Sequence, residues 1–291
     1  MKKNVLVIGG SGFLGSYVAD YLSQKGYNTT VFDIKDSPWL KNDQKFIKGS
    51  IEEFRVIEKA IEGSDFVYNF AALTDLNEAI EKPLKTLNVN VVGNVNVMEA
   101  CRKHNVKRFI YASSVYVQSR EGGFYRCSKQ AAESYVEEFQ KTFGLEYTIL
   151  RYGSLYGPRS DDTNGIFRII KNAIETGKLK YQGHPEAMRE YIHVEDAAQA
   201  SIAALDETYI NKSIILTGQE QMKVIDVIKM IGEILDLPED RVDFSEVHYT
   251  GHYIRTPYSY QPNIGKKYTL PVHIDLGQGL LQLINELKNR N

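Results

Sequence analysis

The stretch "VLVIGGSGFLGSYVADYL", residues 5–22, joins a short apolar run to a segment with helical spacing through three spaced glycines, Gly9, Gly12 and Gly15. Glycines between a strand and a helix let a phosphate approach the backbone, because no Cβ blocks it and positive φ is allowed. The N-terminus of the following helix carries a partial positive charge that suits the same phosphate. The pattern predicts a pyrophosphate site; the alternative is a tight turn with close helix packing.

An acidic residue follows at the distance that a dinucleotide site requires. Asp33 ends the next expected strand, and an acid about twenty residues after the glycines accepts hydrogen bonds from the adenosine ribose and repels a 2′-phosphate. In "FDIKDS" the nearby cation is Lys35, and no arginine follows at once. We therefore expect NAD rather than NADP. The alternative for Asp33 is an ordinary residue at a strand end.

Strands and helices alternate through about residue 151. Such alternation predicts an α/β fold with a parallel sheet covered by helices on both faces. Strands are expected at 5–9, 28–33, 45–48, 66–71, 107–112 and 146–151, and helices at 12–25, 52–61, 83–104 and 125–143. Beyond 151 the pattern loosens into a smaller unit, with helices expected at 166–176, 195–205, 224–235 and 276–287.

The composition argues against several functional classes. A net charge of −2 over 291 residues gives no basic excess for nucleic acid. The first apolar run is far shorter than the roughly 20 residues of a membrane helix. Cys101 and Cys127 have no CxxC spacing, which favours a reducing compartment, so we expect a cytoplasmic protein. His193, His248, His252 and His273 form no complete zinc-binding motif, so no metal site is expected.

The segment "SSVYVQSREGGFYRCSK", residues 113–129, contains a candidate catalytic pair. Tyr125 and Lys129 are four residues apart and share one helix face. A phenol is a poor base near neutral pH, but an ammonium group nearby stabilises the phenolate. Ser113 or Ser114, at the end of the preceding strand, places a hydroxyl where it can bind the same substrate oxygen. The alternative is a Tyr-x-x-x-Lys pattern that occurs by chance.

These motifs together resemble the extended short-chain dehydrogenase/reductases of the nucleotide-sugar epimerase and dehydratase type. The matching segments, in family order, are "GGSGFLG", Asp33, "NFAAL", "NVNVVGNVNVMEAC", "YASS", "YRCSK", "RYGSLYGP" and "REYIHVEDAA". The resemblance implies a Rossmann-like, doubly wound NAD domain at 1–155, to which residues 181–205 return. It also implies a smaller C-terminal α/β domain at 156–291 for a nucleoside diphosphate sugar.

The resemblance also implies roles for individual residues. Tyr125 matches the catalytic base, Lys129 its partner and Ser114 the catalytic hydroxyl, with Ser113 as the second choice. The implied cofactor contacts are Gly9, Gly12, Phe13, Leu14, Gly15, Asp33, Ile34, Ser50, Ile51, Phe70, Ala71, Ala72, Ser113, Tyr125, Lys129 and Tyr152. The implied substrate contacts are Thr74, Ser114, Arg189 and Arg255, the two arginines holding the two phosphates.

The expected activity is NAD-dependent epimerisation of a nucleotide sugar at C4, through a 4-keto sugar with Tyr125 as base. Family dehydratases carry Asp-Glu after the catalytic hydroxyl, whereas Val115 and Tyr116 follow Ser114, so dehydration is less favoured. A reductase or dehydrogenase, a decarboxylase, a 2-epimerase and a sensor or scaffold without turnover stay open. The helices at 83–104 and 125–143 resemble the family's dimer bundle, or their apolar faces are ordinary core. Trp39 lies either near the cofactor or over a loop; we favour the loop.

Overall fold

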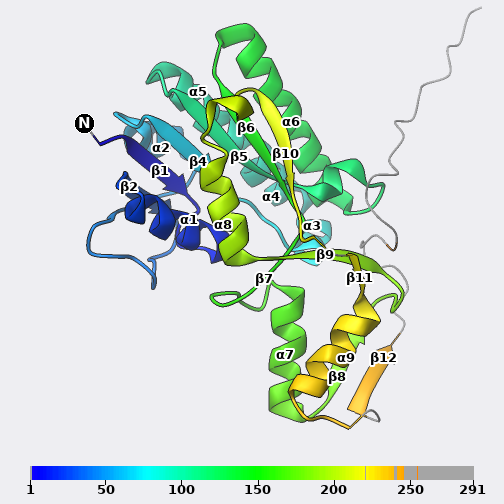
Figure 1. The fold of residues 1–291 in the computed structure, drawn as a ribbon. Coiled ribbons are helices and arrows are strands. Elements are labelled where there is room, and N and C mark those ends of the chain that lie inside the picture. The colour runs from blue at the N-terminus through cyan, green and yellow to red at the C-terminus, as the bar shows by residue number, and fades with distance from the viewer. Residues whose placement is uncertain (1, 220, 239–240, 246–253, 255–291) are drawn as a thin grey trace, which may run out of the picture. The chain divides into compact units, whose positions relative to one another are not determined.

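Seven parallel strands form the central sheet of the computed structural model, which describes residues 2–219, 221–238, 241–245 and 254 (Figure 1). Across the sheet their order is β10-β6-β5-β4-β1-β2-β3. The strands are β1 (Asn4–Ile8), β2 (Asn28–Asp33), β3 (Lys45–Lys48), β4 (Phe66–Asn69), β5 (Arg108–Ser114), β6 (Tyr147–Tyr152) and β10 (Lys212–Leu216). The strand order reverses between β1 and β4, and sheets of this kind bind ligands at the carboxyl ends of the strands beside such a reversal.

The strands are apolar along their length because both faces of the sheet are covered. In β1, Val5 and Val7 belong to the core cluster on one face, whereas Leu6 and Ile8 belong to the cluster on the other. All four side chains are at most 1% exposed. Because strand side chains alternate between faces, an uninterrupted apolar run is typical of a parallel strand buried on both sides. The predicted parallel sheet with helices on both faces is therefore confirmed.

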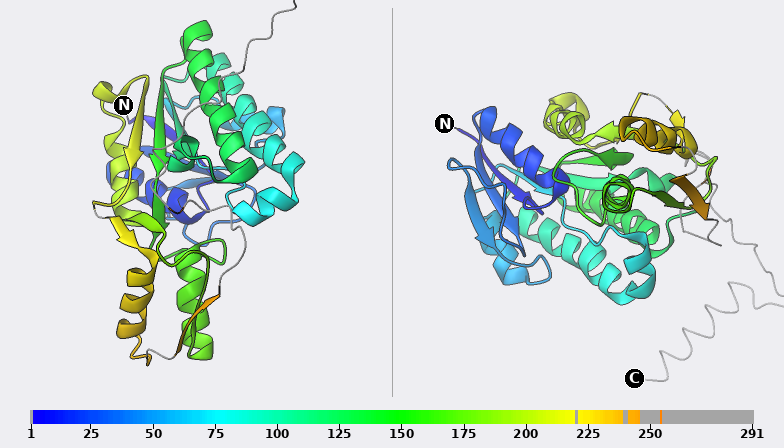
Figure 2. Two further views of the ribbon diagram at one scale, coloured as in Figure 1. Left: turned by 90° about the vertical axis from the view of Figure 1, so that its right-hand side faces the viewer. Right: turned by 90° about the horizontal axis from the view of Figure 1, so that it is seen from below.

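Two groups of helices cover the sheet (Figures 1 and 2). On one face lie α2 (Phe54–Ile61), α4 (Pro83–Leu87), α5 (Asn94–Lys103) and α6 (Gly123–Phe143). On the other lie α1 (Phe13–Gln24) and α8 (Val194–Ala203), which pack against each other. Residues from the part of the chain after 190 thus contribute both a helix, α8, and the edge strand β10 to the layers built by the first 152 residues.

The structure differs from the sequence prediction between β4 and β5. The expected helix at 83–104 contains a π-helical segment, η1 (Asn88–Gly93), between α4 and α5. A helix that was not predicted, α3 (Leu76–Glu81), precedes it. The Asp75 side chain accepts a hydrogen bond from the backbone N–H of Glu78 and so caps α3. Aspartate is a favoured N-cap residue, but the sequence analysis did not assign this role to Asp75. A 3₁₀ turn, η2 (Val115–Gln118), follows β5.

The remaining described elements form two small sheets and two helices. One sheet has the order β11-β9-β7 and the other pairs β12 with β8. The elements are β7 (Ser154–Tyr156), α7 (Gly165–Thr176), β8 (Leu179–Gln182), β9 (Met188–His193), the 3₁₀ turn η3 (Glu207–Tyr209), β11 (Gln221–Lys223), α9 (Val224–Ile234) and β12 (Val242–Ser245). Leu179, Ile228 and their neighbours form a separate apolar cluster between α7 and α9. The helix expected at 276–287 lies outside the described residues.

None of the helices in the described ranges has the length and apolar character needed to cross a membrane. Within the same ranges, no three His, Cys, Asp or Glu side chains gather closely enough to hold a metal ion.

Candidate active site

The glycine turn connects β1 to α1 and brings two loops together. Gly9 has φ of +76°, and a Cβ there would lie 2.7 Å from the backbone nitrogen of Ala71. A Cβ at Gly15 would lie 2.2 Å from the carbonyl oxygen of Gly9. Both glycines are therefore required by the chain's own packing, because the backbone atoms they meet have nowhere to move.

Gly12 has a different role from its two neighbours. Its φ is −81°, and it is the N-cap of α1 without a side-chain cap. Among the described residues, a Cβ there would meet the Gly9 carbonyl oxygen alone, at 3.3 Å. As a glycine, the N-cap residue makes no side-chain hydrogen bond to the first turn of α1, which begins with Phe13 and Leu14. A helix N-terminus with such uncapped backbone N–H groups attracts a phosphate. A Cβ at Gly12 would therefore narrow the space in which a phosphate would lie.

The carboxylate of Asp33 lies against this turn. Its Oδ2 accepts a hydrogen bond from the backbone N–H of Ser11 at 3.0 Å, and its Oδ1 accepts one from Lys35 at 3.1 Å. Each carboxylate oxygen has a second lone pair, so Asp33 can still accept hydrogen bonds from two vicinal hydroxyls. Ile34 beside it is 61% exposed, which leaves this side of the turn open.

Ser50 and Ile51 follow β3 and are held by different contacts. The Ser50 hydroxyl accepts a hydrogen bond from the Glu52 N–H at 3.2 Å, whereas the Ile51 side chain is buried. A Cβ at Gly93 would lie 2.7 Å from Ile51 Cδ1. The Ile51 carbonyl accepts a hydrogen bond from Asn96 at 2.9 Å. The η1–α5 helix therefore fixes the position of this loop.

The loop after β4 contains Phe70, Ala71, Ala72 and Thr74, and asparagines hold its backbone. Asn90, in the π-helical segment η1, accepts from the N–H of Leu73 at 2.7 Å and donates to its carbonyl at 3.0 Å. The Asn90 amide also donates to Ser128 at 2.9 Å. The sequence analysis quoted this asparagine-rich segment but did not select Asn90; the signal was a polar residue repeated within an apolar helix. Thr74 is exposed.

Ser114 and Tyr125 are brought together at the carboxyl end of β5. The Ser114 hydroxyl interacts with the Tyr125 hydroxyl and opposes the rise of its pKa, and Ser114 Oγ accepts a hydrogen bond from the N–H of Tyr116 at 3.3 Å. The Tyr125 ring packs in a small cluster with Leu73 and Ala79, and the Tyr116 ring meets it edge-on with centroids 6.2 Å apart. The Tyr125 side chain is therefore fixed on three sides.

The pKa values of the pair differ from the sequence expectation. Burial raises the pKa of Tyr125 to about 12, although the interaction with Ser114 opposes the shift. Burial lowers the pKa of Lys129 to about 7, although the charge of Glu133 opposes that shift. Lys129 Nζ donates to the Ala112 carbonyl at 2.7 Å and lies 5.9 Å from the Tyr125 ring centroid. In the protein alone, burial outweighs the ammonium, so the phenol is not more acidic than a free one.

Ser113 points to the opposite side of β5 from Ser114, since neighbouring strand residues face opposite ways. Its hydroxyl donates to Glu133 at 2.5 Å, and the Arg151 guanidinium holds the same carboxylate at 2.6 and 3.0 Å. The sequence analysis did not select Glu133 or Arg151. The available signal was that Lys129 and Glu133 are four residues apart and share a helix face.

The Tyr152 side chain is directed into the core. Its hydroxyl shares a hydrogen bond of 2.7 Å with Ser201 of α8, and burial raises its pKa. Its ring lies 6.5 Å from the Phe70 ring, centroid to centroid. Only the backbone of Tyr152 is thus placed beside Ser114, its partner in the β5–β6 register.

Two arginines, Arg189 and Arg255, are expected to bind the substrate. Arg189 is buried on β9, where its Nη1 donates to the Met188 carbonyl at 2.8 Å and its charge acts on Tyr181. Arg255 lies outside the described residues.

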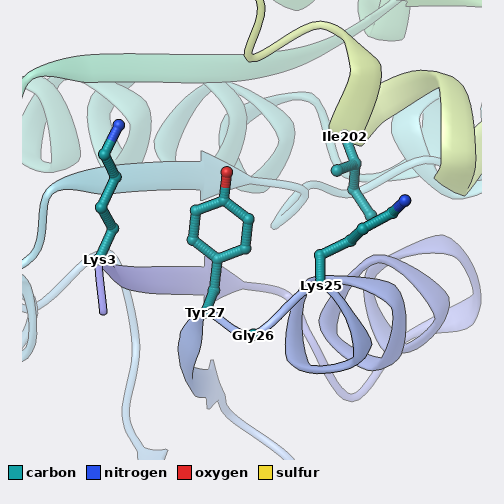
Figure 3. Close-up of a pocket in the computed structure, with 5 residues that line it drawn as sticks. All are labelled: Lys3, Lys25, Gly26, Tyr27 and Ile202. Atoms are coloured by element: carbon teal, nitrogen blue, oxygen red, sulfur yellow. The ribbon is translucent and has the colours of Figure 1, made fainter. Parts of the chain in front are cut away.

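A pocket of about 310 Å³ lies at the other end of the strands, lined by Lys3, Lys25, Gly26, Tyr27 and Ile202 (Figure 3). Lys3 comes just before β1 and Tyr27 just before β2. The pocket is therefore at the amino ends of the strands, whereas the glycine turn, Asp33 and Ser114 are at the carboxyl ends. It is not part of the site built around Tyr125.

Comparison with known proteins identifies the family. The model of the NAD-dependent epimerase/dehydratase family matches residues 5–215. The chain belongs to this family. The uncapped N-terminus of α1 beside Gly12 and the two-oxygen acceptor of Asp33 fit the pyrophosphate and ribose of NAD, the cofactor that the family requires.

Relatives of the chain within the epimerase/dehydratase family carry out different reactions. A UDP-N-acetyl-alpha-D-glucosaminuronate decarboxylase of Bacillus cytotoxicus is 30% identical, over 77% of this chain and 78% of its own. A dTDP-glucose 4,6-dehydratase of Mycobacterium tuberculosis is 25% identical, over 97% and 92%. The crystal structure of the UDP-glucose 4-epimerase of Thermotoga maritima with UDP-glucose superposes with a TM-score of 0.80 at 26% identity, covering 87% of this chain and 88% of that one. The family is thus established, and its members catalyse different reactions.

Proposed function

We propose that this chain is an NAD-dependent nucleotide-sugar epimerase that inverts C4 of the sugar. The observation that carries the proposal is that Ser114 and Tyr125 interact and that the residues after Ser114 are not acids. Val115 is 2% exposed and Tyr116 packs its ring on Tyr125. Elimination of water needs an acid and a base at this place, as in the dehydratases that the chain resembles, and neither residue supplies one.

The proposed roles follow from the geometry of the site. Tyr125 removes the proton of the C4 hydroxyl and returns one when the ketone is reduced. Ser114 binds the same oxygen and keeps it oriented toward the phenol. Lys129 supplies positive charge within 6 Å of the ring, which favours the phenolate. NAD, when bound, supplies the hydride acceptor that becomes the hydride donor of the second half-reaction.

The substrate assignment rests on the family relatives and on a few residues. The names of the relatives point to UDP- and dTDP-sugars as the substrate class. We propose that Thr74 and Ser114 contact the sugar and that Arg189 and Arg255 hold the diphosphate, far from the reacting carbon. Binding energy spent there orients the sugar at C4. We retain the division into an NAD domain at 1–155 and a substrate domain at 156–291 as part of this proposal.

We also propose that the protein is a cytoplasmic homodimer. Large apolar side chains are exposed on the α3–α4–η1 segment, among them Leu84 at 75%, Leu87 at 47% and Val92 at 48%. Such a cluster supports an interface with a second copy. Cys101 and Cys127 are both unpaired, which supports a reducing compartment.

Incubation with a panel of UDP-, GDP-, CDP- and dTDP-sugars tests the proposal. Products are identified by proton NMR while absorbance at 340 nm follows NADH. The proposal predicts a C4 epimer without steady NADH formation. Continuous NADH production would instead indicate a dehydrogenase, a 4-keto-6-deoxy sugar a dehydratase, and release of carbon dioxide a decarboxylase.

A further inference from the structure

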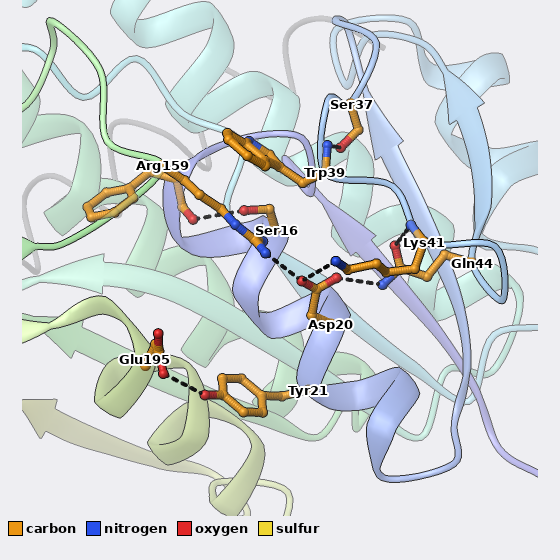
Figure 4. Close-up of polar contacts among 10 residues, drawn as sticks. Ser16, Asp20, Tyr21, Ser37, Trp39, Lys41, Gln44, Arg159 and Glu195 are labelled. Carbon is orange, nitrogen blue, oxygen red and sulfur yellow. Dashed lines mark hydrogen bonds and ion pairs between the residues drawn. The ribbon is translucent and has the colours of Figure 1, made fainter.

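Arg159, in the loop after β7, has a backbone conformation that needs an explanation. Its φ is +67°, in the left-handed region that residues other than glycine seldom adopt. Its guanidinium reaches α1, where Nη2 lies 2.8 Å from Asp20 Oδ2 (Figure 4). A strained backbone persists only where the surroundings determine it, and such positions cluster at functional sites.

Asp20 joins Arg159 to the loop after β2. The Asp20 carboxylate is 9% exposed, and Lys41 is 4.0 Å from the oxygen that binds Arg159. Its other oxygen accepts a hydrogen bond from the buried amide of Gln44 at 3.0 Å. Gln44 in turn accepts from the N–H of Lys41 at 3.0 Å. One buried carboxylate therefore fixes both the guanidinium and the end of the loop.

Two aromatic rings complete the arrangement. The Arg159 guanidinium lies 4.1 Å from the centroid of the Tyr17 ring and 4.9 Å from that of Trp39. Tyr17 is on α1, and Trp39 is at the centre of the 34–44 loop. A guanidinium stacks on aromatic faces through its planar charge in a way that a lysine cannot reproduce. We call Arg159, Asp20, Tyr17 and Trp39 the Arg159 latch.

The Arg159 latch is not the arrangement expected if it served only to stabilise the fold. Arg159 Nη1 is buried and has no hydrogen-bond partner among the described residues. A buried and partly satisfied charge pair is often no more stable than apolar residues of similar volume. This argues for a role in positioning.

The latch connects two segments with different tasks. The 34–44 loop starts directly after Asp33, and its Lys35 backbone bonds both the Asp33 carboxylate and the Ser11 hydroxyl of the glycine turn. The loop that bears Arg159 leads through Asn164, which caps α7 by accepting from Phe167, into the part assigned above to the substrate. Arg159 is the link between the adenosine side of the cofactor site and this second segment.

We propose that Arg159 is a positioning residue for the cofactor: the latch holds the 34–44 loop on α1 and thereby strengthens the binding of NAD. The inference rests on the proposed function, since an epimerase that recycles its NAD in place gains from retaining it. Because the latch acts on the adenosine side, it affects the affinity for NAD and not the chemistry at Tyr125.

Trp39 is the only tryptophan of the chain, so its fluorescence reports on the latch directly. The full-length protein is titrated with NAD by calorimetry, and Trp39 emission is recorded before and after addition. Arg159→Met is expected to weaken NAD binding about fivefold or more, within the usual range of coupling between sites, and to shift the emission to longer wavelength. Arg159→Lys keeps the charge but loses the stacking, and is expected to give an intermediate affinity.

Lys171→Met is the matched control, because it removes an exposed ion pair with Asp162 in the neighbouring segment. Unchanged NAD affinity in Arg159→Met, or an equal loss in Lys171→Met, would overturn the proposal. If Arg159→Met does not fold, Arg159→Lys and Trp39→Leu decide by the same affinity measurement. These readouts do not depend on turnover, so failure of the latch is distinguishable from failure of the proposed epimerase activity.

Discussion

Tyr125 is the residue on which the proposed chemistry depends. Its hydroxyl interacts with Ser114, and its ring is fixed by Leu73, Ala79 and Tyr116. Replacement by phenylalanine removes the base and keeps the packing. We expect turnover to fall by about 10²–10⁴-fold, the usual contribution of a general base, while the affinity for NAD and the melting temperature stay near those of the wild type. A physiological output that survived this change would favour a sensor or scaffold.

Ser114 and Ser113 offer a matched comparison because neighbouring hydroxyls face opposite sides of β5. Ser114→Ala removes the partner of Tyr125, so we expect kcat to fall by roughly 10²-fold, as for loss of one positioned donor. Ser113→Ala removes only a bond to Glu133, so we expect a much smaller change in kcat. Steady-state kinetics of both variants on the same sugar nucleotide distinguish them. A larger loss in Ser113→Ala would reassign the catalytic hydroxyl.

The pH dependence follows from Tyr125 and Lys129 acting as a coupled pair. The first proton leaves the pair near the lowered pKa of Lys129, about 7, and the singly protonated pair can hold a phenolate beside an ammonium. We therefore expect kcat/KM to rise as pH increases through about 7. Ser114→Ala removes the interaction that opposes the rise in the pKa of Tyr125, which makes the phenolate less favourable. We expect a lower plateau of kcat/KM with the rise still near pH 7, because the first proton leaves Lys129. A profile that falls through this range would contradict the pairing.

At the scale of the elements, two glycines of the β1–α1 turn have different expected roles. Gly15 allows the chain to pack, and Gly12 leaves space for a ligand. Gly15→Ala places a Cβ against the Gly9 carbonyl, and we expect a loss of about 1–3 kcal/mol or more in the free energy of unfolding. Gly12→Ala meets little of the chain, and Ala for Gly at an N-cap costs about 1 kcal/mol or less. Its Cβ nevertheless narrows the space for a phosphate, so we expect NAD binding to weaken strongly. Thermal melts and calorimetry measure the two effects separately.

Elements with strong periodicity were predictable, and those fixed by distant contacts were not. The apolar runs of β1 and β4 and the spacing of α6 were sufficient because their burial depends on local pattern. The π-helical segment was not predictable, because Asn90 adopts it while binding Leu73 across the sequence. The same holds for the site: Tyr125 and Lys129 stand out by spacing, whereas the raised pKa of Tyr125 depends on burial that only the folded chain provides.

For the whole molecule, the alternation of strands and helices predicted a parallel sheet covered on both faces, but it did not predict the strand order β3-β2-β1-β4-β5-β6 or the place of β10 at the edge. β10 comes more than fifty residues after β6 yet pairs with it in parallel register, and no local signal in residues 212–216 identifies that partner. The sequence identified the family through motifs at the carboxyl ends of the strands. It did not identify Arg159 as a link between two segments, because its partners on α1 and in the 34–44 loop are distant in sequence.

The central claim is that hydride leaves C4 and returns to C4 within one active site while Tyr125 moves the proton. The most direct measurement uses a sugar nucleotide from the active panel that carries deuterium at C4, with the product analysed by NMR and mass spectrometry. The account predicts that the epimer keeps the deuterium at C4 and that no labelled NADH accumulates in solution. Loss of the label from C4, to the solvent, to free NADH or to another carbon of the sugar, would contradict it.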